Sequence, residues 1–201
     1  MFEFQEDLKY YYNDGAAYNI TAHMTQPLFE DLFDKIDQVV DEDDQQGNTS
    51  RSVLNFAHSE TVQPFMTALG LYRDQEDLLA SDWGTDRQEH EWQVARIASF
   101  ATNVGILVFE CEASQRKIES QSSEEDESSE EDDSSEEKMS NSSEEEDEGS
   151  LSKEWKVMMF HQERAVAQPG CGELVCSLAQ FSEAYRHFAN HDFDTVCQNG
   201  I

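Results

Sequence analysis

A run of acidic and serine residues at 120–149 cannot belong to the folded core that the rest of the chain can form. The run holds 15 Asp or Glu residues and one Lys, so it carries −14 of the formal net charge of −31. Met139 is its only apolar residue. Because a segment with such low hydrophobicity and high charge cannot offset the entropy lost on ordering, we expect residues 120–149 to be disordered.

Residues 1–119 and 150–201 together have the composition of an ordinary globular domain. When the acidic run is left out, the apolar fraction rises from 37% to about 43%, which is enough for a buried core. The negative net charge argues against nucleic acid or an anionic membrane surface as the main partner, since both favour clustered Lys and Arg. No apolar run approaches the roughly 20 residues of a transmembrane helix. A small phosphate-bearing ligand needs only a few cations and remains compatible with this composition.

Hydrophobic periodicity predicts a chain of alternating helices and strands. Helices are expected over residues 4–12, 25–40, 62–69 and 177–188, with Gly15 and Gly70 as stops and a capping box formed by Ser177 and Gln180. Strands are expected over residues 52–57, 104–109 and 155–160. The pattern therefore predicts an α/β fold.

The two later strands, 104–109 and 155–160, flank the acidic run. We expect 104–109 to be a buried strand and 155–160 to be its partner, so that residues 120–149 form an enlarged hairpin loop between them. The entropy cost of closing a loop grows only logarithmically with its length, so a long insertion is tolerated best at such a position.

The predicted strand over residues 52–57 feeds the next helix through a short turn that contains His58 and Glu60. The first N–H groups of a helix carry partial positive charge, so such a turn is a natural seat for phosphate. His58 could donate a hydrogen bond to a phosphoryl oxygen, and Glu60 could be held protonated in a partly desolvated pocket. By itself the His-x-Glu spacing is equally compatible with a solvated helix cap.

The residues around this turn carry a family resemblance. His58-Ser59-Glu60-Thr61, with Gln63-Pro64-Phe65-Met66-Thr67-Ala68-Leu69-Gly70 after it, resembles the second active-site motif of the branch of the histidine phosphatase superfamily that contains the multiple inositol polyphosphate phosphatases. The segments 2–15, 101–111, 162–166 and 170–181 also resemble that family. Ala57, Ser59 and Gln162 depart from its usual residues, but none of them removes a functional group that the family mechanism names.

The resemblance implies a fold, a mechanism and a missing part. The fold would be the C-terminal half of a histidine phosphatase domain: part of a central, mostly parallel sheet flanked by helices, without its N-terminal half. Family members form a phosphohistidine on the His of an Arg-His-Gly-x-Arg-x-Pro motif, a later His binds the phosphoryl group, and a Glu protonates the leaving oxygen. His58 matches the phosphate-binding role and Glu60 the general acid.

No Arg-His-Gly sequence occurs in the 201 residues, so the resemblance implies a truncated chain that is inactive without its N-terminal half. Unpaired strand edges and exposed apolar faces would make it poorly stable when alone. The substrates implied are small phosphomonoesters, above all inositol polyphosphates such as phytate. A second activity implied is that of a bisphosphoglycerate 3-phosphatase. No cofactor or metal is implied. The alternative is a non-catalytic protein, derived from the same fold, whose acidic residues bind basic partners.

Cysteines and glycosylation sequons point to an oxidising compartment. Cys111, Cys171, Cys176 and Cys197 could form two disulfides. The family resemblance implies a Cys171–Cys176 pair and places the partners of Cys111 and Cys197 in the N-terminal half; free thiols or a Cys111–Cys197 pair are the alternatives. Sequons begin at Asn19, Asn48 and Asn141. We expect a protein of the endoplasmic reticulum lumen, the cell surface or the exterior, although residues 1–7 do not resemble a signal peptide.

His187 and His191 lie four residues apart on the predicted terminal helix, a spacing that can bind zinc. The sequence has no glutamate directly after His187 and offers no convincing third ligand nearby. We therefore interpret the pair as part of a surface helix face and expect no metal site.

Overall fold

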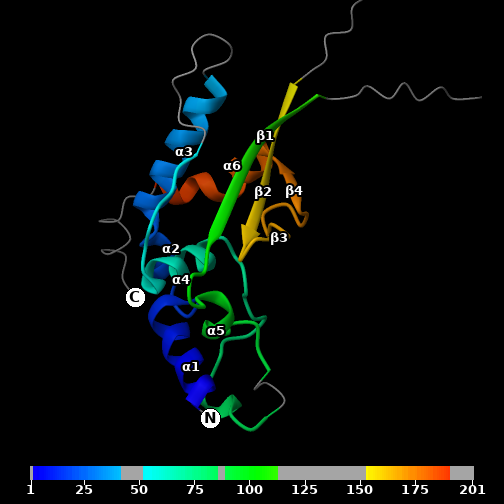
Figure 1. The fold of residues 1–201 in the computed structure, drawn as a ribbon. Coiled ribbons are helices and arrows are strands. Elements are labelled where there is room, and N and C mark those ends of the chain that lie inside the picture. Colours follow the sequence, from blue (N-terminus) through cyan, green and yellow to red (C-terminus); the bar gives the residue numbers. More distant parts are fainter. Residues whose placement is uncertain (1, 42–51, 86–88, 113–152, 191–201) are drawn as a thin grey trace, which may run out of the picture. The chain divides into compact units, whose positions relative to one another are not determined.

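The computed structural model describes residues 2–41, 52–85, 89–112 and 153–190 (Figure 1). The chain divides into two compact units: Met1–Glu110 with Trp155–Ile201, which we call the body, and Cys111–Glu154. The acidic run at 120–149 lies outside the described residues, so its expected disorder stays a prediction. No helix in the described ranges is long and apolar enough to cross a membrane.

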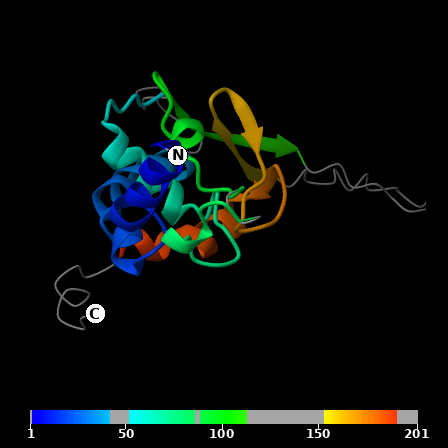
Figure 2. The ribbon, with the colours of Figure 1, turned by 90° about the horizontal axis from the view of Figure 1, so that it is seen from below.

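Helices form most of the body (Figures 1 and 2). In chain order they are α1 (Phe2–Asp14), α2 (Asn19–His23), α3 (Gln26–Asp41), α4 (Ser59–Ala68), the short 3-10 helix η1 (Ala80–Asp82), α5 (Val94–Ile97) and α6 (Leu178–Ala189). The predicted helices correspond to α1, α3, α4 and α6. The short helices α2 and α5 were not predicted, because so few residues carry no clear period.

Local stop and start signals act as the sequence predicts. Gly15 follows α1 directly, and a Cβ atom at that position would lie 2.7 Å from the Tyr11 carbonyl oxygen and 2.9 Å from the Trp92 ring. Gly70 follows α4 with a φ of 73°, a conformation that favours glycine. At the start of α6, Ser177 Oγ accepts from the Gln180 backbone N–H at 3.2 Å, which completes the expected capping box.

Helices α3 and α6 build a large part of the core. The predicted apolar face of α3 is buried at Phe29, Phe33 and Ile36. Phe33 and Phe181 have ring centroids 5.8 Å apart, and Phe29 and Phe188 are 5.2 Å apart. Such aromatic contacts stabilise the helix pair beyond the simple burial of area.

Four strands form one sheet: β1 (Val104–Glu112), β2 (Lys153–His161), β3 (Arg164–Val166) and β4 (Val175–Ser177). β2 pairs with β3 and β4 in antiparallel fashion, and β1 and β2 run in opposite directions in Figure 1. The α/β class is confirmed, but the described sheet is antiparallel where the family resemblance implied a mostly parallel one. The physical reason is connectivity, since β2 and β3 are joined by a tight turn, whereas parallel strands need a long crossover.

The prediction of a strand at residues 52–57 is wrong, since the structure has no strand there. This segment is extended but pairs with no described strand, and its side chains are exposed, Leu54 at 80% and Phe56 at 95%. A strand forms only when a neighbour satisfies its backbone groups, and β-rich sequence alone cannot supply one.

Burial differs between the two longer strands. β2 alternates as a half-buried strand should, with Val157, Met159 and His161 buried. The expected burial of 104–109 is wrong, because β1 is half-buried at most positions and Leu107 is 49% exposed. Among the described strands β1 ends the order β1-β2-β3, so it has a neighbour on one side only.

Candidate functional site

His58 stands at the N-terminal end of α4, as the motif predicts. Its backbone is extended, with φ −89° and ψ 168°, and its carbonyl oxygen accepts from the N–H groups of Thr61 at 3.0 Å and Val62 at 3.2 Å. Its side chain makes no capping hydrogen bond and is exposed. The imidazole therefore lies at the positive end of the helix, where an anion would be favoured.

Glu60 lies in the first turn of the same helix, but its surroundings differ from those expected. The side chain is exposed, and Ser59 Oγ donates a hydrogen bond to Oε2 at 3.0 Å. Its own backbone N–H, then Ser59 and the charge of His58, hold the pKa of Glu60 below its ordinary value. The expected partly desolvated pocket is absent from the described residues, because no other segment of them covers the carboxylate. Glu60 is thus set up as an anion here.

The far end of α4 is fixed firmly in the body. Phe65, Met66 and Ala68 are buried, and the Leu71 N–H donates to the Met66 carbonyl at 3.0 Å beyond the helix end. Pro64 lies inside the helix and has no N–H, so the Glu60 carbonyl lacks its usual partner four residues on. The helix is therefore anchored at its C-terminal half, while its first turn presents His58 and Glu60 to solvent.

Asp14 is a carboxyl near Glu60 that sequence reasoning missed. It ends α1, and its carbonyl oxygen accepts from Thr67 Oγ1 of α4 at 3.4 Å. Burial, and then the negative charge of Glu60, raise the pKa of Asp14. No motif surrounds Asp14, and only the packing of α1 against α4 brings it close to Glu60.

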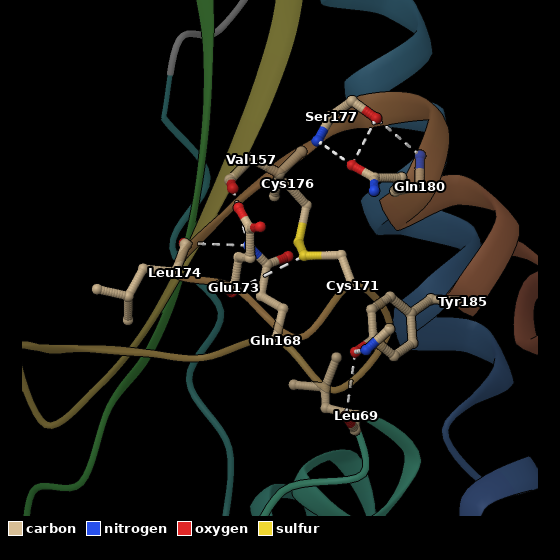
Figure 3. Close-up of a disulfide and its surroundings, with 11 residues drawn as sticks. Leu69, Val157, Gln168, Cys171, Glu173, Leu174, Cys176, Ser177, Gln180 and Tyr185 are labelled. Atoms are coloured by element: carbon tan, nitrogen blue, oxygen red, sulfur yellow. Dashed lines mark hydrogen bonds between the residues drawn. A yellow bond between two sulfur atoms is a disulfide. The ribbon is translucent and has the colours of Figure 1, made fainter.

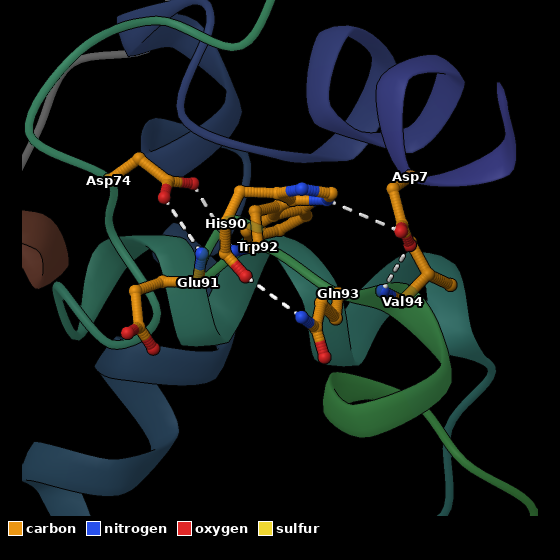
Figure 4. A network of polar contacts seen from close by, with 7 residues as sticks. All are labelled: Asp7, Asp74, His90, Glu91, Trp92, Gln93 and Val94. Atoms are coloured by element: carbon orange, nitrogen blue, oxygen red, sulfur yellow. Dashed lines mark hydrogen bonds and ion pairs between the residues drawn. The ribbon is translucent and has the colours of Figure 1, made fainter. Parts of the chain in front are cut away.

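A second polar cluster joins α1 to the segment before α5 (Figure 4). His90 Nε2 lies 3.3 Å from Asp7 Oδ2 with both side chains buried, and Asp7 Oδ1 accepts from the Val94 N–H at 2.7 Å. Burial raises the pKa of Asp7 above its ordinary range. Asp74 accepts from the backbone N–H groups of Glu91 and Trp92, at 2.7 and 3.2 Å. These contacts fix residues 90–94 to α1 and to Asp74.

A surface depression lies beside this cluster and does not include His58 or Glu60. Its lining is mixed in charge and consists of Arg73, Asp74, Gln75, Glu76, Leu78, Glu89, His90, Glu91, Gln93 and Arg96. With four carboxyl groups against two guanidinium groups, it favours no anionic ligand. This depression is therefore not a phosphate site.

The predicted disulfide is present. Cys171 and Cys176 are bonded across the loop that leads into β4, with Cα atoms 6.1 Å apart (Figure 3). Beside it, the buried Gln168 donates to the Val157 carbonyl at 2.8 Å, and Tyr185 Oη donates to the Leu69 carbonyl at 3.2 Å. The disulfide thus reinforces a loop that is also tied to β2 through Gln168 and to Tyr185 of α6, whose hydroxyl accepts from the Gly170 N–H at 3.2 Å.

The structure describes one of the two remaining cysteines and one of the three sequons. Cys111 is a free thiol on β1, and Cys197 lies outside the described residues. Asn19 is the exposed first residue of α2, so its side chain is accessible for the attachment of a glycan. Asn48 and Asn141 lie outside the described ranges. Glycosylation stays a prediction for all three.

No group of three or more potential metal ligands occurs in the described part of the chain. His187 is exposed on α6, and the position of His191 is not described. No described cluster therefore supplies the ligands of a metal centre.

Comparison with known proteins decides the family. The profile of the histidine phosphatase superfamily (branch 2) matches residues 2–139, which include His58 and Glu60. The chain belongs to this superfamily.

Three relatives of this chain share the name multiple inositol polyphosphate phosphatase 1. The Gallus gallus protein is 32% identical over 121 residues, which cover 59% of this chain and 27% of the relative. The Homo sapiens protein is 30% identical over 112 residues, covering 55% of this chain and 23% of the relative. The Drosophila melanogaster protein is 30% identical over all 201 residues and 33% of its own length. This histidine phosphatase chain thus spans a third or less of these relatives, and no solved structure matches it significantly.

Proposed function

We propose that this chain is part of a phosphomonoesterase that acts on inositol polyphosphates such as phytate, and on bisphosphoglycerate as a second substrate. His58 binds the phosphoryl group and Glu60 protonates the leaving oxygen. The observation that carries the proposal is the placement of these two residues on the first turn of one anchored helix, inside the region that matches the superfamily. The relatives named as inositol polyphosphate phosphatases support the substrate class.

The chemistry of a phosphomonoester explains these residue types. The leaving alkoxide is strongly basic, so a proton delivered in the transition state accelerates the reaction by about 10²–10⁴-fold. The helix N-terminus and His58 balance the phosphoryl charge. A covalent route also needs a nucleophile, and no Arg-His-Gly sequence supplies one within the 201 residues. We propose that the nucleophile belongs to an N-terminal half of the same protein and that this chain is inactive alone.

The exposed segment before His58 supports a missing partner. Leu54 and Phe56 are exposed on an extended backbone that pairs with no described strand. Exposed apolar side chains of this kind invite a second polypeptide segment. A segment that covered residues 52–57 would also exclude water from Glu60 and raise its pKa toward that of a proton donor. The N-terminal half is the partner that we propose for this position.

The proposed compartment is the endoplasmic reticulum lumen, the cell surface or the exterior. The Cys171–Cys176 disulfide supports it, since disulfides persist in oxidising compartments. Glycan attachment at Asn19 would be detected as a loss of mass after treatment with an endoglycosidase.

A direct test compares Glu60→Gln with Glu183→Gln in the longest product of the gene, with phytate as substrate. Glu183 is an exposed carboxylate on α6 and serves as the control. The Glu60 variant should lose about 10²–10⁴-fold in kcat, because the leaving group then departs without a general acid. An unchanged kcat in the Glu60 variant would remove it from the mechanism.

The second candidate is a non-catalytic protein whose acidic residues bind basic partners. The exposed carboxylate of Glu60, with its lowered pKa, and the acidic run favour it. Adding a polypeptide that contains Arg-His-Gly-x-Arg-x-Pro discriminates between the two candidates. Restored phosphatase activity supports the enzyme, whereas a salt-sensitive complex with a basic protein and no activity supports the alternative.

A further inference from the structure

His161 is a buried histidine with defined hydrogen-bond roles at the end of β2. Only 4% of the residue's surface is exposed. Nε2 lies 3.0 Å from the Ile97 carbonyl oxygen, which can only accept, so Nε2 carries the proton. Nδ1 lies 2.6 Å from Tyr72 Oη and therefore accepts from that hydroxyl in the neutral ring. Thr102 Oγ1, 3.1 Å from Nε2, completes the shell.

These contacts join segments that are far apart in the sequence. Tyr72 belongs to the turn after α4, Ile97 ends α5, and Thr102 precedes β1. Tyr72 has a φ of 55°, which is unfavourable for a bulky residue and must be held by its surroundings. The His161–Tyr72 bond therefore helps to fix the C-terminal end of α4 to the sheet.

The charges around His161 oppose its protonation. The Arg96 guanidinium lies 4.9 Å from the Tyr72 ring centroid, and its Nη1 is 3.6 Å from Glu91 Oε2. Arg164 is opposite His161 in the β2–β3 register and is exposed. Burial lowers the pKa of His161, the Ile97 hydrogen bond opposes that shift, and the charge of Arg96 adds to it.

We propose that His161 is a pH-sensitive latch that holds the turn after α4 on the sheet when the ring is neutral and releases it when the ring is protonated. A protonated Nδ1 cannot accept from Tyr72, and the ring would then place a buried positive charge near the exposed guanidinium of Arg96. Release would loosen the C-terminal end of α4, the helix whose N-terminal end presents His58 and Glu60. The latch is a property of the fold and does not depend on the proposed phosphatase activity.

The sign of the effect follows from linkage. A histidine with a lowered pKa in the folded state binds fewer protons than in the unfolded chain, where its pKa is about 6.5. Stability is then fully present above that value and falls as the pH drops below it. Between pH 7.5 and pH 5.5 the protonated fraction of the histidine in the unfolded chain rises about tenfold. His161 can therefore raise the unfolding equilibrium constant by up to about tenfold over this range.

The test is urea unfolding at pH 7.5 and pH 5.5 of the longest product of the gene, compared with His161→Gln and His187→Gln. His187 is exposed on α6 and controls for an ordinary histidine. Between pH 7.5 and pH 5.5 the unfolding equilibrium constant of wild type and of the His187 variant should rise by up to about tenfold more than that of the His161 variant. An equal rise in all three proteins would overturn the latch.

Tyr72→Phe keeps the histidine and provides a second readout if His161→Gln does not fold. The Leu71 N–H, which donates to the Met66 carbonyl at 3.0 Å, reports on the turn through its hydrogen-exchange protection. Protection in the wild type should fall at pH 5.5, and the Tyr72 variant should have low protection already at pH 7.5. Protection that is the same in both proteins at both pH values would also overturn the proposal.

Discussion

Ser59 and Glu60 are adjacent in the first turn of α4, and their hydrogen bond helps to set the charge of the candidate acid. Ser59 Oγ donates to Glu60 Oε2 at 3.0 Å, and this bond contributes to the lowered pKa of Glu60, after its own backbone N–H. A general acid needs the opposite environment, one that favours the protonated form. Glu60 is therefore held as a carboxylate by the residues present, and delivery of a proton requires a change around it.

Ser59→Ala should raise the pKa of Glu60 toward the ordinary glutamate value, because a donor to the carboxylate is lost. Titration of the Glu60 side-chain carbon signal by NMR measures this directly. The signal of Glu183, exposed on α6, should be unchanged in the same variant. A pKa of Glu60 that stayed the same or fell would mean that the Ser59 hydrogen bond does not lower it.

At the scale of elements, α3 and α6 are held together by both apolar and ionic contacts. Arg186 of α6 donates to both carboxyl oxygens of Asp37 on α3, at 2.8 and 2.6 Å. Its guanidinium also lies 4.5 Å from the Phe33 ring centroid. This two-point contact gives the helix pair a fixed register that packed phenylalanine rings alone would not define.

Asp37→Asn should lower the free energy of unfolding at pH 7 by up to about 1 kcal/mol, since both partners are more than a third exposed and solvent screens the pair. The hydrogen bonds from Arg186 lower the pKa of Asp37, so its contribution is present above the ordinary value for aspartate and is lost as the pH falls below it. Urea unfolding should thus find the two proteins different at pH 7 and more alike near pH 2.5.

The matched control is Glu30→Gln, which removes one charge from the same helix but no contact between helices. Glu30 accepts only from Gln26 of α3, at 2.8 Å, among the hydrogen bonds described for it. A loss equal to that of Asp37→Asn would mean that helix charge, not the contact with Arg186, carries the effect.

At the scale of the whole molecule, the acidic run lies between two paired strands. β1 ends at Glu112 and β2 begins at Lys153, so residues 120–149 belong to the connection between neighbours in the sheet. The body contains the described helices and the core, whereas Met139 is the only apolar residue of the highly charged run. Its removal should leave the body folded.

Deletion of residues 120–149 cuts the connection from β1 to β2 to about a quarter of its length. Loop closure costs about 0.6 kcal/mol per doubling, so the deletion should raise the free energy of unfolding by about 1 kcal/mol. Urea unfolding at low and high salt measures the change. A Gly/Ser replacement of equal length separates length from charge: it should keep the stability of the parent at high salt and exceed it at low salt. A destabilised deletion variant would mean that the run packs on the body.

Local signals in the sequence determined the elements that need no distant partner. Gly15 and Gly70 end their helices and the Ser177–Gln180 box begins α6, because caps and stops act within a few residues. The His58 position at a helix start follows in the same way. The Cys171–Cys176 pair came instead from the family resemblance, and the structure confirms it.

Only the tertiary structure decided which apolar segments are paired and which polar groups meet. Residues 52–57 have the composition of a strand but lack a described neighbour, and Glu60 has the motif of an acid but the surroundings of an anion. The contacts of His161 with Tyr72, and of Thr67 with Asp14, join segments that share no sequence pattern. Burial and pairing are properties of the packed chain, so residue types alone could suggest these roles but could not assign them.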